Sequence, residues 1–218
     1  MCSSDLNPGE SGKHVRLKVE AHYQSLALSP DGKYLAASRI EGKQIEIWDV
    51  SARAPVPNLP RLDGGEFFTF SPDGQWFVTS SPRSFFFWQV GTWQRGQDLR
   101  HSGNQPGPMA FSRDGGIFAM AVSPTTIELI QFPSRERLAR LENPDRRRLL
   151  SLTFSPDARR LAAASTEQLV LMWDLALISR ELSELNLRGK LPAFPEKSLD
   201  SRPLAVEPEH KPAEPGTE

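Results

Sequence analysis

The chain of 218 residues carries 26 Lys and Arg against 27 Asp and Glu, and its net charge of -1 excludes a uniformly basic nucleic-acid binder. With 38% hydrophobic and 24% charged residues the composition is globular, and no apolar run approaches the roughly 18 residues of a membrane-spanning helix. One cysteine, Cys2, excludes an internal disulfide and any site built from several cysteines. We expect no cofactor, no metal, no nucleic-acid partner and no membrane insertion by this segment.

The first residues of the chain are expected to lie outside the fold. Met1–Leu6 resembles the translated end of a sequencing adapter and is excluded, and Cys2 is excluded with it. Residues 7–22 are expected to form a linker and, through the alternation at His14–Val19, the outer strand of a preceding sheet. This expectation makes the chain the C-terminal part of a longer protein.

A four-residue motif recurs at intervals of 42, 41 and 43 residues. Its copies are Ser29-Pro30-Asp31-Gly32, Ser71-Pro72-Asp73-Gly74, Ser112-Arg113-Asp114-Gly115 and Ser155-Pro156-Asp157-Ala158. A second marker follows each copy 17 to 19 residues later, at Trp48-Asp49, Trp88-Gln89, Ile130-Gln131 and Trp173-Asp174. Two markers that keep phase through four copies indicate a repeat architecture.

Each copy of the motif predicts a hairpin between antiparallel strands, because Pro sets φ, Asp bonds to its own backbone and Gly accepts a left-handed conformation. In the first repeat Ser25–Leu28 leads into the turn, Tyr34–Ala37 leads out, and Gln44–Trp48 alternates as a third strand. Val56–Pro60 is expected as a fourth strand, at the edge, where prolines are tolerated. Four strands in about 42 residues predict the blade of a β-propeller. The predicted fold class is therefore all-β, with four blades over residues 23–174 that form part of a larger ring.

The second repeat is rich in aromatic residues, which predict core. Phe85-Phe86-Phe87-Trp88 does not alternate between apolar and polar residues. Such a run is typical of a strand that is buried on both faces.

These markers resemble those of the WD-repeat (tryptophan-aspartate repeat) β-propeller family, over the stretch from Val15 to Asp174. The resemblance implies structural repeat tryptophans at Trp48, Trp88 and Trp173, and structural turn residues at Asp31, Gly32, Asp73, Gly74, Asp114, Gly115 and Asp157. The family often bonds a His near the start of each repeat to an Asp in the turn before the third strand. Only His22 and His101 are placed for that part, and the matching turns contain no Asp, so this network is not expected.

The period ends after Trp173. Leu175, Ile178, Leu182 and Leu185 share a helical face behind the N-cap residue Asp174, which predicts an amphipathic helix over residues 175–187 against the last blade. Residues 188–218 are rich in prolines and charges and predict a disordered tail. This ending is similar to that of large bacterial WD-repeat proteins, many of which carry a serine/threonine protein kinase ahead of the propeller.

No catalytic constellation occurs in the sequence, so the residues present are not expected to form an enzyme. G-x-S-x-G, H-E-x-x-H and C-x-x-C motifs are absent, and the four histidines are scattered. A hydrolase site in a central channel would need acids or histidines on the inner strands. The expected inner strands, Ser25–Leu28, Phe67–Phe70, Met109–Phe111 and Ser151–Phe154, carry neither.

Six arginines cluster in the outer strand and following loop of the third repeat: Arg135, Arg137, Arg140, Arg146, Arg147 and Arg148. Such a cluster can bind phosphate or an acidic protein surface. Glu136, Glu142 and Asp145 interleave with it, and no aromatic ladder accompanies it, so a solvated loop is the preferred interpretation.

The main hypothesis is a non-catalytic scaffold that binds other proteins through loops on a stiff propeller. By family topology, the loops between second and third strands and those between blades share one face. Partner contacts are expected there at Arg39, Lys43, Arg83, His101, Asn104, Arg146, Arg147 and Arg148. The alternative is the sensory or substrate-recruiting C-terminal region of a bacterial signalling enzyme, such as a serine/threonine protein kinase with its catalytic domain upstream. A cytoplasmic location is expected in either case.

Overall fold

A computed structural model describes residue 17 and residues 22–41, 44–62, 66–101, 103–105, 107–166, 169–185, 191, 192 and 194. The expectations for residues 1–16, including the adapter remnant, lie outside this part, as does Lys43. The elements are β1 (Tyr23–Leu28), β2 (Tyr34–Arg39), β3 (Ile45–Asp49), β4 (Ala54–Pro55), β5 (Phe68–Phe70), β6 (Trp76–Ser80), β7 (Ser84–Gln89), β8 (Leu99–Arg100), β9 (Met109–Phe111), β10 (Ile117–Ser123), β11 (Thr126–Gln131), β12 (Arg137–Glu142), β13 (Leu149–Phe154), β14 (Arg160–Ser165), β15 (Val170–Asp174) and α1 (Leu175–Glu184).

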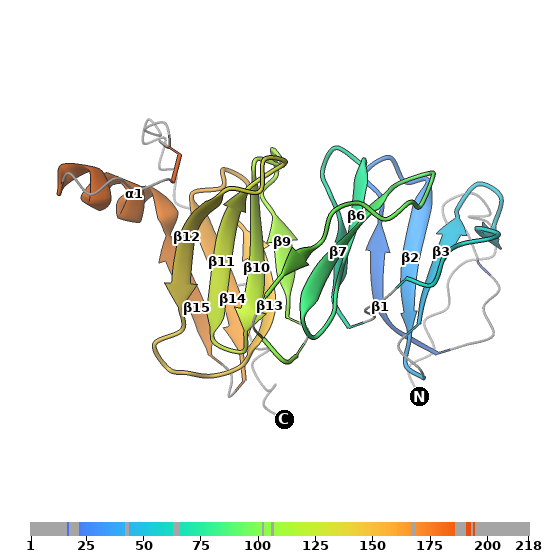
Figure 1. Ribbon diagram of the computed structural model, residues 1–218, viewed down its shortest axis with the longest axis horizontal. Coiled ribbons are helices and arrows are strands. Elements are labelled where there is room, and N and C mark those ends of the chain that lie inside the picture. Colours follow the sequence, from blue (N-terminus) through green and yellow to red (C-terminus); the bar gives the residue numbers. More distant parts are fainter. Residues whose placement is uncertain are drawn as a thin grey trace, which may run out of the picture.

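The strands form four antiparallel sheets in chain order, which confirms the predicted all-β propeller blades. Blade 1 has the order β1-β2-β3-β4, blade 2 β5-β6-β7-β8, and blade 3 β9-β10-β11-β12. Blade 4 has the order β13-β14-β15 within the described residues, and α1 follows it directly. The inner strands of neighbouring blades contact one another, β1 with β5, β5 with β9 and β9 with β13. Figure 1 shows blade 4 with α1 at one end of the row and blade 1 at the other.

The fourth strand of blade 1 lies earlier than predicted. Val56–Pro60 was expected there, whereas β4 comprises Ala54 and Pro55, which pair with Asp49 and Trp48. One further backbone bond, from Val56 N to the Ile47 carbonyl (2.8 Å), ends the pairing. Asn58 then takes a left-handed φ of 56°, which turns the chain away from the edge and brings Leu62 into the core.

The four motif copies form the hairpin tips that the sequence predicts. In the first, Ser29 Oγ donates to Asp31 Oδ1 (2.5 Å) and accepts from Tyr34 N (2.8 Å), while Gly32 N donates to the Ser29 carbonyl (2.8 Å). The same contacts recur in the tips that begin at Ser71, Ser112 and Ser155. The fourth residue of each tip has positive φ: 73° at Gly32, 70° at Gly74, 75° at Gly115 and 57° at Ala158. The aspartates Asp31, Asp73, Asp114 and Asp157 are thus turn residues, since each accepts the serine hydroxyl hydrogen bond.

Each hydrophobic cluster lies between two neighbouring blades, and β10 shows why. Ile117, Ala119 and Ala121 point toward blade 4, whereas Phe118 and Met120 point toward blade 2. A strand of period two therefore buries both faces, as blades in a row require.

The aromatic strand β7 follows the same rule, which confirms the burial predicted for it. Phe85 and Phe87 pack toward blade 3, and Trp88 packs toward blade 1. Trp48 and Trp88 are buried, and Trp173 is partly buried.

The helix α1 ends three residues before the predicted boundary. Asp174 caps it by accepting a hydrogen bond from Leu177 N (2.9 Å), as predicted, and Leu175 is fully buried against blade 4. Leu191 and Phe194, which the sequence assigned to the disordered tail, join the same cluster. The other residues after 185, apart from Pro192, lie outside the described part.

Candidate functional site

The loops that carry most of the predicted contact residues lie at one edge of the blades. They connect β2 to β3, β6 to β7, β10 to β11 and β14 to β15, or join one blade to the next. In an antiparallel blade these connections lie opposite to the hairpin tips, so they share a surface, which we call the loop face. Backbone hydrogen bonds join the two kinds of loop, from His101 N to the Arg83 carbonyl (3.0 Å), from Leu149 N to the Pro124 carbonyl (2.9 Å) and from Thr166 N to the Arg148 carbonyl (3.0 Å).

An ion pair crosses the loop face between blades that are not neighbours in sequence. Arg148 Nη2, just before β13, lies 2.9 Å from Glu66 Oε1, just before β5, although 82 residues separate them. Both side chains are partly buried, with 39% and 27% of their surface exposed. Arg148 therefore helps to position the loops of blades 2 and 4, and its predicted role as a partner contact stays a prediction.

His101 also has a structural environment. Its Nδ1 lies 3.0 Å from the Val122 carbonyl oxygen and 3.1 Å from Gly103 N, and its ring packs on Phe85 at 5.2 Å between centroids. Burial lowers the pKa of His101 below its ordinary value of 6.5, because desolvation penalises the imidazolium. His101 is thus neutral near pH 7. Its contact with Val122 links the connection between blades 2 and 3 to the end of β10.

Arg39 is occupied as well, since it pairs with Glu46, which also accepts a hydrogen bond from the Tyr23 hydroxyl. The remaining predicted contact residues are Arg83, Asn104, Arg146 and Arg147, and all four are exposed. The structure thus shows that the predicted set contains both exposed side chains and side chains that take part in contacts within the fold.

Two apolar surfaces escaped the sequence analysis. Leu26 and Leu28 on β1 are 65% and 58% exposed, and Val170 and Met172 on β15 are 73% and 63% exposed. They belong to the first and last blades, whose outer faces meet no further blade among the described residues. These strands alternate in the same way as the strands of the middle blades, in which both faces are buried. The sequence pattern alone therefore does not distinguish the exposed apolar faces from the buried ones.

In the described part of the chain, no group of three or more His, Cys, Asp or Glu residues is arranged to hold a metal ion. No helix within it is long and apolar enough to cross a membrane.

Comparison with known proteins relates the chain to one repeat family. Residues 136–174 match the model described as WD domain, G-beta repeat. This segment contains β12 and all three strands of blade 4, so the matched unit begins with an outer strand and continues into the next blade.

Solved structures show the same fold. The chain is similar to Kuenenia stuttgartiensis hydrazine synthase, with 21% identity and a TM-score of 0.61, over 77% of this chain and 49% of that chain. The chain thus spans about half the length of that structure, and at this identity the likeness concerns the fold alone. Because 1302 chains of solved structures match, the fold is widespread and does not single out an activity.

Proposed function

We propose that this β-propeller, in which residues 136–174 match a WD repeat, is a non-catalytic scaffold whose loop face binds other proteins. The observation that carries the proposal is the Arg148–Glu66 ion pair of 2.9 Å, which joins loops of blades 2 and 4 beside exposed cationic side chains. Loops held in this way lose little conformational entropy when a partner binds. Arg83, Asn104, Arg146 and Arg147 are the proposed contacts, and the positive charge of the three arginines favours an acidic partner surface.

The role as a recruiting region of a signalling enzyme stays a prediction. No feature of the described residues favours it over a scaffold.

Charge reversal on the loop face tests the proposal. The full-length chain with Arg146→Glu is compared with Arg113→Glu, an exposed arginine at the hairpin tip of blade 3 and therefore on the opposite side. We expect proteins that co-precipitate with the unmodified chain at low salt to be lost with Arg146→Glu and retained with Arg113→Glu, because rim charges act through long-range attraction. Equal yields for both variants at low and moderate salt would contradict the proposal. Arg148 is left unchanged, because its reversal would also break the ion pair with Glu66.

A further inference from the structure

A groove of about 520 Å³ lies on the rim of the molecule, between the outer strand of blade 2 and the face of blade 3. It arises because the outer strands differ in length. β8 comprises only Leu99 and Arg100, whereas β11 and β12 comprise six residues each. The short strand leaves part of the longer blade uncovered, and we call this space the rim groove.

Four arginines line the rim groove: Arg100, Arg135, Arg137 and Arg140. The strand register explains why the last two face it. Arg140 pairs with Glu128 across β11 and β12, and Arg137 pairs with Ile130, so these side chains project from the same face as the groove residues of β11. Arg100 comes from blade 2, on the other side of the groove.

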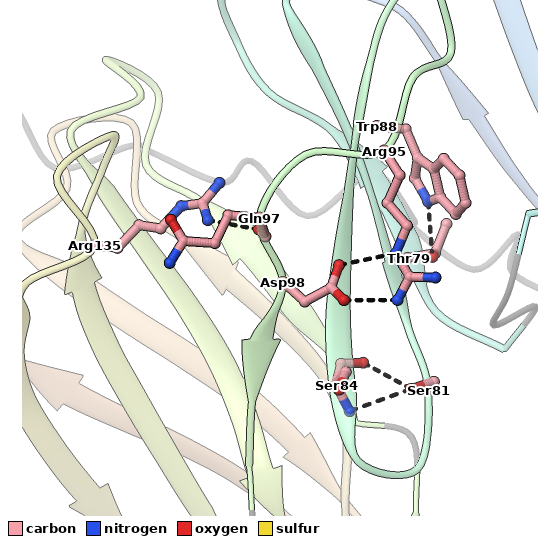
Figure 2. Close-up of polar contacts among 8 residues, drawn as sticks. All are labelled: Thr79, Ser81, Ser84, Trp88, Arg95, Gln97, Asp98 and Arg135. Atoms are coloured by element: carbon pink, nitrogen blue, oxygen red, sulfur yellow. Dashed lines mark hydrogen bonds and ion pairs between the residues drawn. The ribbon is translucent and has the colours of Figure 1, made fainter.

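Arg135 is fixed in place before any ligand binds. Its Nη1 donates to the Gln97 carbonyl of blade 2 (2.5 Å), as Figure 2 shows. Its guanidinium lies 4.5 Å from the centroid of the Phe87 ring. Burial lowers the pKa of Arg135, because the charged group has lost part of its water. This contact ties the β11–β12 turn to blade 2 and sets the width of the groove at that end.

The positive charge in the groove is only partly neutralised. Glu128 is the one acidic residue of the lining, and its Oε1 lies 3.5 Å from Arg137 Nη1. Arg140 pairs at 3.3 Å with Glu142, but both side chains are largely exposed, so water screens this pair. Among the residues that the structure describes, Arg100 has no ion-pair partner. Four guanidinium groups thus face one lining carboxylate.

The floor of the groove is apolar, and this feature selects the kind of anion. Met120 and Ile130 are buried beneath the arginines, and Leu99 is half-buried beside them. A nucleic acid would gain from aromatic surfaces for base stacking, and none lines the groove. A second groove of about 410 Å³ beside blade 1 provides an internal contrast, because its lining holds one arginine, Arg61, and one glutamate, Glu46.

We propose that the rim groove binds an extended acidic segment of another protein, with carboxylates on Arg100, Arg137 and Arg140 and an apolar side chain over Leu99. Guanidinium groups bind carboxylates through paired hydrogen bonds, which a lysine cannot reproduce. The inference goes beyond the proposed function and uses no residue of the loop face, so either can fail without the other.

A defined peptide tests this site on the full-length chain. The probe is a fluorescein-labelled pentapeptide that alternates glutamate with leucine, and binding is measured by fluorescence anisotropy at low and at moderate salt. We expect the double variant Arg100→Gln/Arg140→Gln to weaken binding at least fivefold, about what two partly screened charge pairs contribute. The control Arg113→Gln, remote from the groove, should change the dissociation constant less than twofold.

Glu128→Gln provides a gain of binding that a folding defect cannot imitate. It removes the carboxylate that competes for Arg137, so the peptide should bind about two- to fivefold more tightly. No binding of the peptide to the unmodified chain, or equal weakening by Arg113→Gln, would overturn the proposal. Competition by inorganic phosphate or by a single-stranded oligonucleotide as effective as that of unlabelled peptide would also overturn it, as would equal binding of a pentapeptide with lysine in place of glutamate.

Discussion

The hydrogen bond between Trp88 and Thr79 offers a quantitative test of the blade core. Trp88 Nε1 donates to Thr79 Oγ1 at 3.2 Å (Figure 2), and the two residues are 2% and 0% exposed. Thr79→Val keeps the shape of the side chain but removes the acceptor, which leaves a buried N–H unpaired. An orphaned buried donor costs about 1–3 kcal/mol, and the long donor–acceptor distance favours the lower half of that range. We therefore expect Thr79→Val to lower the free energy of unfolding by about 1–2 kcal/mol.

A double-mutant cycle isolates this hydrogen bond from other effects. Trp88→Phe removes the N–H, so the coupling between the two changes, rather than the cost of Thr79→Val alone, measures this hydrogen bond and should be about 1–2 kcal/mol. Guanidinium unfolding followed by far-ultraviolet circular dichroism is the assay, because the substitution alters tryptophan fluorescence. A coupling below about 0.5 kcal/mol, within the additivity expected of independent sites, would refute the reasoning.

Three further predictions follow from the turns and from His101. Gly32→Ala should cost about 1 kcal/mol in chemical denaturation, because its φ is 73° and an added Cβ meets nothing within 4 Å, so only backbone strain is added; a cost above about 2 kcal/mol would contradict this. Gly107→Ala should cost at least about 2 kcal/mol, since its Cβ would lie 2.1 Å from the Ala121 carbonyl oxygen, whereas Gly116→Ala, with no contact under 3.5 Å, should be nearly neutral. Because the pKa of His101 is lowered on folding, the unfolded chain binds the proton more readily, and stability should fall as pH decreases below 6.5. Replacement of His101 by Gln should flatten that fall in pH-dependent denaturation.

The repeat and its hairpin tips could be predicted from sequence because they depend on local chemistry. Ser29, Asp31 and Gly32 form hydrogen bonds with one another within a single turn, so the four-residue motif is sufficient to predict that turn. The alternation of the strands likewise predicted the blades.

The roles of individual site residues could not be predicted, because they depend on contacts between distant parts of the chain. Arg148 resembles its neighbours Arg146 and Arg147 in sequence, yet its ion pair with Glu66, 82 residues away, follows from no feature of its local sequence. His101 is likewise defined by Val122 and Phe85, which belong to other strands. The sequence predicts in which loop a residue lies, whereas tertiary packing decides which side chains of that loop a partner can reach.

Departures from the repeat also explain a local defect in blade 1. In the strand register, Leu35 pairs with Trp48 as Phe77 pairs with Trp88, so Ala37 holds the position of Thr79. Trp48 Nε1 accordingly has no hydrogen-bond partner of normal geometry, although the Tyr23 hydroxyl lies nearby. The absent hydroxyl leaves blade 1 without the buried hydrogen bond that blade 2 has.

The same reasoning connects the repeat to binding. The residues that recur in every blade, the Ser and Asp of the hairpin tips, stabilise the turns, so they contribute to the scaffold and not to a binding site. The outer strands are the most variable part, with two residues in β4 and β8 and six in β12. Where a short strand stands beside a long one, blade 3 is left uncovered and its arginines face a groove instead of a neighbour. Outer strands of equal length would close that groove. Lengthening β8 by apolar residues that pair along β7 should therefore abolish binding of the acidic peptide without loss of stability.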